Sequence, residues 1–183
     1  MRRSNSARLL AAGAVAAVVL GLGVAARAAD TSTSFTLTSG SLSINPPGSS
    51  NLGSVPAGTT TIFAQLGTVT VNDNRGASNG SWTASVSSTD FTTGSGTPPN
   101  QVVTKANVAY ASGPATNQTG TATTTPGQSN PASPVDLSVT RTAFSASAIT
   151  GNESTSWNPT VYVSPSSSNV AGVYTGTITH SVA

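Results

Sequence analysis

Large apolar residues recur at every second position through most of this chain, and Ser or Thr commonly fills the positions between them. Clear examples are residues 82–86, residues 135–139 and residues 174–182. Successive side chains of a β-strand point to opposite faces, so this spacing places apolar groups on one face and polar groups on the other. The period of 3.6 that an amphipathic helix requires is not evident after residue 28. The sequence therefore predicts strands that each bury one face.

The runs number roughly eight to ten and are separated by Gly, Pro, Asn and Ser, which favour turns. We predict an all-β protein with an antiparallel, immunoglobulin-like β-sandwich. The first predicted strand carries Phe35 and Leu37. Residues 92–100 and residues 111–134 interrupt the pattern and are predicted loops. The second is long, low in complexity and nearly free of large apolar groups, so we expect a mobile excursion within one domain.

Residues 1–28 have the pattern of a helical secretory signal peptide. Arginines near the start precede an apolar run that ends in Ala26-Arg27-Ala28. Small residues at these positions suit a signal peptidase, so we expect cleavage between Ala28 and Ala29. The alternative is a retained transmembrane helix, because the run of about 18 residues is close to the minimum that spans a bilayer. Cleavage leaves residues 29–183, which is the length of a single domain.

Charge is scarce after the leader and excludes several functions. The basic residues are Arg75, Lys105 and Arg141, against five acidic residues. Nucleic-acid binding needs clustered Lys and Arg, and so does a polybasic membrane contact, so neither is expected after leader removal. The sequence has no Cys, which excludes disulfides and thiolate chemistry.

The densest polar group is Asn72-Asp73-Asn74-Arg75-Gly76. Three interpretations are open. Asp73 and Arg75 can form an ion pair while Gly76 takes a positive φ in a turn. The oxygen atoms can hold calcium, although no Asp or Glu repeats at the usual spacing. Asp73 and Arg75 can also contact a ligand directly.

The two tryptophans, Trp82 and Trp157, lie in alternating segments and have two possible roles. They can form an aromatic platform that stacks on sugar rings, or they can anchor the core, because a buried indole contributes a large apolar area. Spacing alone leaves both roles open.

Catalysis is not predicted. Residues 76–80 match the Gly-x-Ser-x-Gly elbow of serine hydrolases, but that motif requires a following helix, and an alternating run follows here. A Gly, Asn and Ser cluster between two strands is typical of a hairpin. The only His, His180, is in phase with Tyr174 and Ile178 and is interpreted as a packing residue. No cofactor is expected.

Several motifs together resemble the WxL-domain family of Gram-positive surface proteins, and this chain resembles a divergent member. The resemblance covers roughly residues 35–183. Its elements, in order, are Asp-x-Arg-Gly at residues 73–76, Trp82, Asp-Phe at residues 90–91, Trp157 and Ala-Gly-x-Tyr at residues 171–174. The Leu that follows each family tryptophan by two positions is replaced here by Ala84 and by Pro159.

The resemblance implies a secreted, non-catalytic protein that associates non-covalently with the bacterial cell wall, with peptidoglycan or another wall glycan as ligand. It also implies that Trp82 and Trp157 are the two motif tryptophans. Other surface proteins are possible partners. The alternative is a self-assembling subunit, adhesin, pilin-like or layer-forming, in which residues 29–38 are donated as a strand to a neighbour's sheet edge.

Overall fold

The computed structural model describes residues 27–183, so the predicted signal-peptide helix lies almost entirely outside the described residues. The chain divides into two units, Met1–Thr36 and Leu37–Ala183. In the first unit, residues 27–36 are exposed and have no regular secondary structure, and Ala28 and Ala29 at the predicted cleavage site are among them. The predicted strand around Phe35 and Leu37 is wrong, because both residues lie outside any strand and are 86% and 87% exposed.

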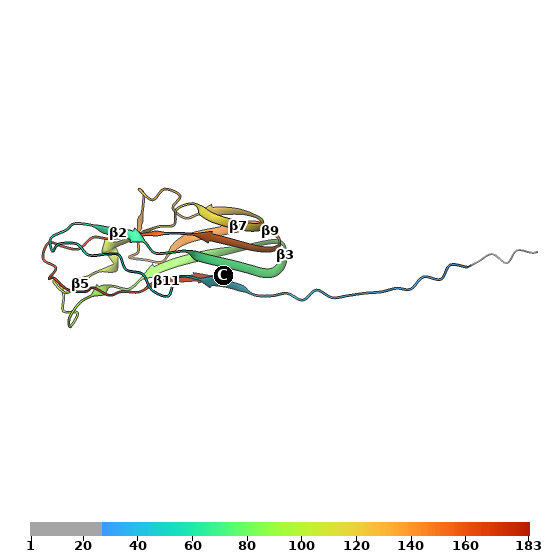
Figure 1. The fold of residues 1–183 in the computed structure, drawn as a ribbon, viewed down its shortest axis with the longest axis horizontal. Helices are drawn as coiled ribbons and strands as arrows, with labels where there is room; N and C mark the ends of the chain where they lie inside the picture. Colours follow the sequence, from blue (N-terminus) through green and yellow to red (C-terminus); the bar gives the residue numbers. More distant parts are fainter. Residues whose placement is uncertain (1–26) are drawn as a thin grey trace, which may run out of the picture. The chain divides into compact units, whose positions relative to one another are not determined.

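The second unit consists of antiparallel strands (Figure 1), which confirms the predicted all-β sandwich. Its only helical segment is one short 3₁₀ turn, η1 (Lys105–Asn107). In chain order the strands are β1 (Leu42–Asn45), β2 (Ile62–Gln65), β3 (Val69–Ser88), β4 (Phe91–Thr92), β5 (Val102–Val103), β6 (Val108–Ala111), β7 (Ala115–Pro126), β8 (Val135–Asp136), β9 (Arg141–Trp157), β10 (Thr160–Val163) and β11 (Ile178–Val182).

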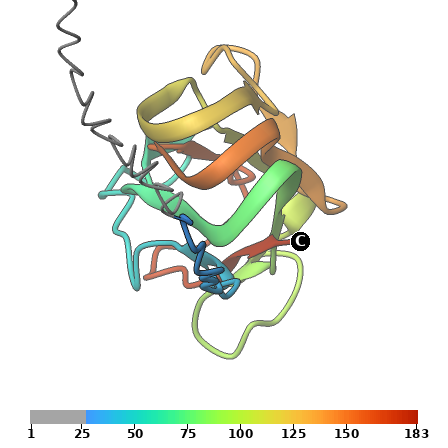
Figure 2. The ribbon, with the colours of Figure 1, turned by 90° about the vertical axis from the view of Figure 1, so that its right-hand side faces the viewer.

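Strand β3 is the centre of the larger sheet. Strand β9 pairs along one side of β3, and β7 pairs with the far side of β9. Figure 2 shows these three strands side by side and bending together. Strands β1 and β11 share the other side of β3, with β1 along its first part and β11 along its last. The second sheet has the order β2-β10-β6-β8, and β4 and β5 form a small separate ribbon.

The core is formed by inward-facing residues of both larger sheets, and part of it lies between the two arms of the bent larger sheet, because Trp82 on one arm of β3 bonds to Glu153 on the opposite arm of β9. Along β3, β9, β6 and β10 the buried residues largely alternate with more exposed ones, as the period of two predicts. Burying these side chains is the main favourable contribution to folding. The large buried side chains are Trp82, Trp157, Tyr110, Phe144, Leu137, Ile149, Val69, Val71, Val86, Val108 and Val161.

The segment at residues 76–80 is a bend within a strand and not a hairpin. Strand β3 continues through it for 20 residues. Gly76 and Asn79 both have positive φ, at 63° and 64°, and the register with β9 shifts around them. Inserted residues of this kind bend and twist a strand, and the two arms of β3 on either side of the bend pair with β1, β9 and β11 but not with each other. The interpretation as a hairpin is therefore wrong, although the positive φ of Gly76 is as expected.

The predicted mobile excursion at residues 111–134 contains an ordered strand, β7, which corrects the sequence-based prediction. This strand pairs with β9 along most of its length, although most of its side chains are exposed. Apolar burial was the wrong criterion here, because main-chain hydrogen bonds to β9 and the β-preference of Thr hold the strand. Within the segment, residues 112–114 and residues 127–134 form turns and irregular chain.

Gly120 provides a test of β7. It has a φ of 79°, and a Cβ atom added there would collide with the main-chain oxygen of Asn152 on β9. We expect Gly120→Ala to lower the free energy of unfolding by roughly 1–3 kcal/mol, because strain and a backbone clash add together. Urea denaturation measures the change. Gly48→Ala is the matched control, since nothing lies within 4 Å of its Cβ position. Equal stability of the two variants contradicts the β7–β9 pairing.

Candidate functional site

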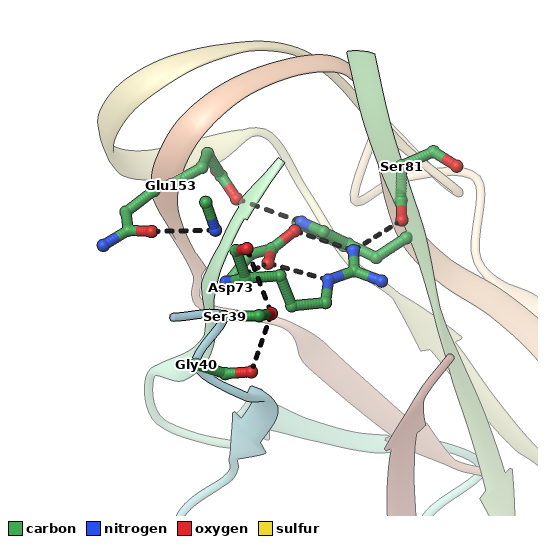
Figure 3. A network of polar contacts seen from close by, with 9 residues as sticks. Ser39, Gly40, Asp73, Ser81 and Glu153 are labelled. Atoms are coloured by element: carbon green, nitrogen blue, oxygen red, sulfur yellow. Dashed lines mark hydrogen bonds and ion pairs between the residues drawn. The ribbon is translucent and has the colours of Figure 1, made fainter. Parts of the chain in front are cut away.

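Asp73 and Arg75 on β3 form a bidentate ion pair (Figure 3). The Arg75 Nε donates to Asp73 Oδ1 at 2.8 Å, and Nη2 donates to Oδ2 at 2.7 Å. Asp73 is fully buried, whereas the Arg75 side chain is 35% exposed. The hydrogen bond from the Arg75 side chain holds the pKa of Asp73 below its usual range despite burial. Of the three interpretations of residues 72–76, the structure contains the ion pair.

The same guanidinium also closes the bend of β3. Its Nη2 donates to the main-chain oxygen of Ser81 at 2.8 Å, on the far side of the bend. The Gly76 amide donates to Asn152 Oδ1 on β9 at 3.1 Å, and Ser39 Oγ donates to the Arg75 carbonyl at 3.1 Å (Figure 3). Because both oxygens of Asp73 accept from Arg75, this carboxylate is not free to bind a cation.

Glu153 on β9 is the second buried acid of the site, and sequence reasoning missed it. It lies directly opposite Asp73 in the register of β3 and β9 and is 3% exposed. Its Oε2 accepts from Trp82 Nε1 at 3.0 Å, and its Oε1 accepts from the Thr155 hydroxyl. The available signal was spacing, since Glu153 is four residues before Trp157 and therefore on the same face of the strand.

Trp157 takes part in a chain of polar contacts that joins the two sheets. Its Nε1 donates to the Tyr110 hydroxyl at 2.9 Å, and that hydroxyl lies 3.1 Å from His180 Nε2. The three residues come from β9, β6 and β11, so the Tyr110 hydroxyl connects the second sheet to two strands of the first. Phe144 stacks on the Trp157 indole with ring centroids 4.9 Å apart.

The structure places both tryptophans in the core. Trp82 is 2% exposed and Trp157 is 0% exposed. Neither indole face is open to solvent, so neither stacks on a sugar ring in this conformation. Of the two roles that the sequence left open, core anchor is the one the burial supports, and each indole N–H is satisfied by a buried acceptor.

His180 is a packing residue, as expected, and it is 8% exposed. Burial lowers the pKa of its imidazole to about 4. The Tyr110 oxygen accepts from Trp157 Nε1 and lies beside His180 Nε2, whereas His180 Nδ1 is buried and has no hydrogen-bond partner within residues 27–183. Burial also raises the pKa of Tyr110, so this chain of contacts is neutral.

The hydrolase motif does not have the context that its chemistry requires. Ser78 lies within β3, where a strand and not a helix follows, and His180 on β11 contacts Tyr110 on β6 of the second sheet. Within residues 27–183, no cluster of three His, Asp or Glu side chains is arranged to hold a metal ion.

A stacked pair of aromatic rings lies on the outer face of the second sheet. Phe63 on β2 and Tyr162 on β10 are register partners, with ring centroids 5.4 Å apart. Phe63 is 63% exposed, and the Tyr162 hydroxyl donates to the Pro131 carbonyl at 2.6 Å, which holds its ring in place. Gln65 and Thr160 form the next register pair on the same face. Sequence reasoning missed this pair because it depends on which strands are neighbours.

Comparison of the chain with protein-family models, with curated proteins and with solved structures found no match. Among the residues that the structure describes, no helix has the length and apolar character needed to cross a membrane.

The buried imidazole predicts a specific pH dependence of stability. Its pKa is about 4 in the folded protein against an ordinary 6.5, so the unfolded chain binds the extra proton in this window. The contribution of neutral His180 to the free energy of unfolding is fully present above pH 6.5. It declines as the pH falls towards 4, by about 3 kcal/mol in total.

Urea titrations at several pH values measure this decline, and His180→Gln is the matched variant because the sequence has no other His. We expect the variant to flatten the dependence between pH 6.5 and 4. The pKa values of Asp73 and Asp136 are lowered from 3.8, so their contributions to stability are lost only at a pH below this window. An unchanged slope in the variant contradicts the burial of His180.

Proposed function

We propose that this protein is a secreted, non-catalytic surface protein of the WxL type that associates non-covalently with the bacterial cell wall, and that peptidoglycan is its ligand. The observation that carries the proposal is the Phe63–Tyr162 pair on the outer face of the second sheet, in which Phe63 is 63% exposed. The signal-peptide pattern of residues 1–28 and the motif order around Trp82 and Trp157 support it.

The aromatic pair suits a glycan chain. Sugar rings have apolar C–H faces and polar edges, so they bind well where an aromatic surface lies beside hydrogen-bonding groups. Gln65 and Thr160 supply such groups two register positions away, on the same face of the sheet. The stacking role considered for the tryptophans therefore passes to Phe63 and Tyr162, while the tryptophans hold the scaffold.

Arg75 offers a second kind of contact. Its Nε and Nη2 are used by Asp73 and Ser81, whereas Nη1 makes no hydrogen bond within residues 27–183. The side chain is one-third exposed. Peptidoglycan carries peptide carboxylates, which pair well with a guanidinium, and Asp73 fixes the direction in which Arg75 points. Arg75 is thus a candidate ligand contact and Asp73 its positioning residue.

Sedimentation with purified, insoluble peptidoglycan tests the proposal. We expect the protein to move to the pellet, and we expect Phe63→Ala combined with Tyr162→Ala to weaken binding about tenfold or more, because stacking on each ring contributes on the order of 1 kcal/mol. Val139→Ala is the control, since Val139 is 56% exposed and lies outside the aromatic pair. A tube without peptidoglycan controls for self-association.

Protein that stays in the supernatant at both low and high salt overturns the wall-binding proposal. If instead the double variant sediments as well as the parent protein, wall binding stands and the aromatic pair is not its contact.

A further inference from the structure

An apolar groove lies between residues 50–59 and residues 170–176, away from the Phe63–Tyr162 pair. Its volume is about 760 Å³, and none of its lining residues is charged. Val173, Val55 and Val170 are 85%, 42% and 41% exposed there. Exposed apolar patches of this kind on a soluble domain mark sites of interaction. Other apolar residues that line the groove are Leu52, Ile62, Phe91, Val163 and Tyr174.

One wall of the groove is an open strand edge. Thr175 pairs with Thr92 of β4 through two main-chain hydrogen bonds of 2.9 and 3.0 Å. In such an antiparallel pair, the residues on either side direct their N–H and C=O groups to the opposite side. These residues are Tyr174 and Gly176, which line the groove and make no main-chain hydrogen bond with any described residue. The edge can therefore accept a further strand.

The chain also carries a segment with the properties of such a strand. Phe35 and Leu37 are two positions apart, so an extended chain places both side chains on one face, and both are almost fully exposed. The main chain of residues 31–38 makes no hydrogen bond within the described part of the chain. Residues 31–41 carry no charge, which matches the uncharged groove.

We propose that residues 31–38 of one copy bind as an added strand in the groove of a second copy, beside Tyr174 and Gly176, with Phe35 and Leu37 against the apolar lining. Main-chain hydrogen bonds supply affinity in this mode, and side-chain pockets supply specificity. The donor segment and the acceptor groove are different surfaces, so the contact is heterologous and propagates into chains of subunits. This assembly does not depend on wall binding.

Light scattering coupled to size-exclusion chromatography, at increasing concentrations of the exported chain, tests the inference. We expect species larger than a monomer. Phe35→Ser combined with Leu37→Ser removes the donor, and Val55→Asp introduces a charge into the groove; each variant alone is expected to be monomeric. Val139→Ser is the control, because Val139 is 56% exposed but lies outside both surfaces.

A mixture of the two monomeric variants gives the sharpest result. The donor variant retains a groove and the groove variant retains a donor, so the mixture has a single compatible contact and should form heterodimers but no longer chains. A parent protein that is monomeric at every concentration overturns the inference, and so do variants that assemble as the parent does. Sedimentation with peptidoglycan should be unchanged in both variants, which separates this inference from the proposed function.

Discussion

The Tyr110 hydroxyl is the contact on which the rest of the sandwich depends. It accepts from the Trp157 indole and contacts the His180 imidazole, and so joins β6 of one sheet to β9 and β11 of the other. Unpaired polar groups in a core cost several kcal/mol, so these three side chains fix how the sheets face each other. Trp82 and Trp157, whose N–H groups bond to buried acceptors, are therefore core residues.

Two buried acids, Asp73 and Glu153, take part in the contacts that hold the larger sheet in its bent form. Asp73 is neutralised by Arg75, which also bonds to Ser81 and so holds the bend of β3. Glu153, directly opposite on β9, is held by the indole of Trp82. Breaking a buried pair leaves an uncompensated charge, which makes such networks specific to one arrangement of the strands. The bend belongs to the larger sheet, whereas the Phe63–Tyr162 pair lies on the outer face of the second sheet.

The alternation of apolar and polar residues predicted the fold class and the buried faces of the strands, because successive side chains of a strand point to opposite faces and one face is buried. The Asp73–Arg75 ion pair was one of three interpretations that the polar residues 72–76 left open, and the structure contains it. The alternation did not predict β7, whose side chains are exposed and whose stability comes from main-chain pairing with β9. It could not predict the Phe63–Tyr162 pair, because that pair depends on β2 and β10 being neighbours.

Both indoles are structural and buried, and the proposed wall contact is made elsewhere. Quenching of tryptophan fluorescence by acrylamide tests their burial most directly, because Trp82 and Trp157 are the only tryptophans in the sequence. The account predicts blue-shifted emission and weak quenching in the folded protein, unchanged when peptidoglycan fragments are added, and strong quenching in urea. Emission typical of indole in water, with strong quenching of the folded protein that peptidoglycan fragments relieve, would contradict it.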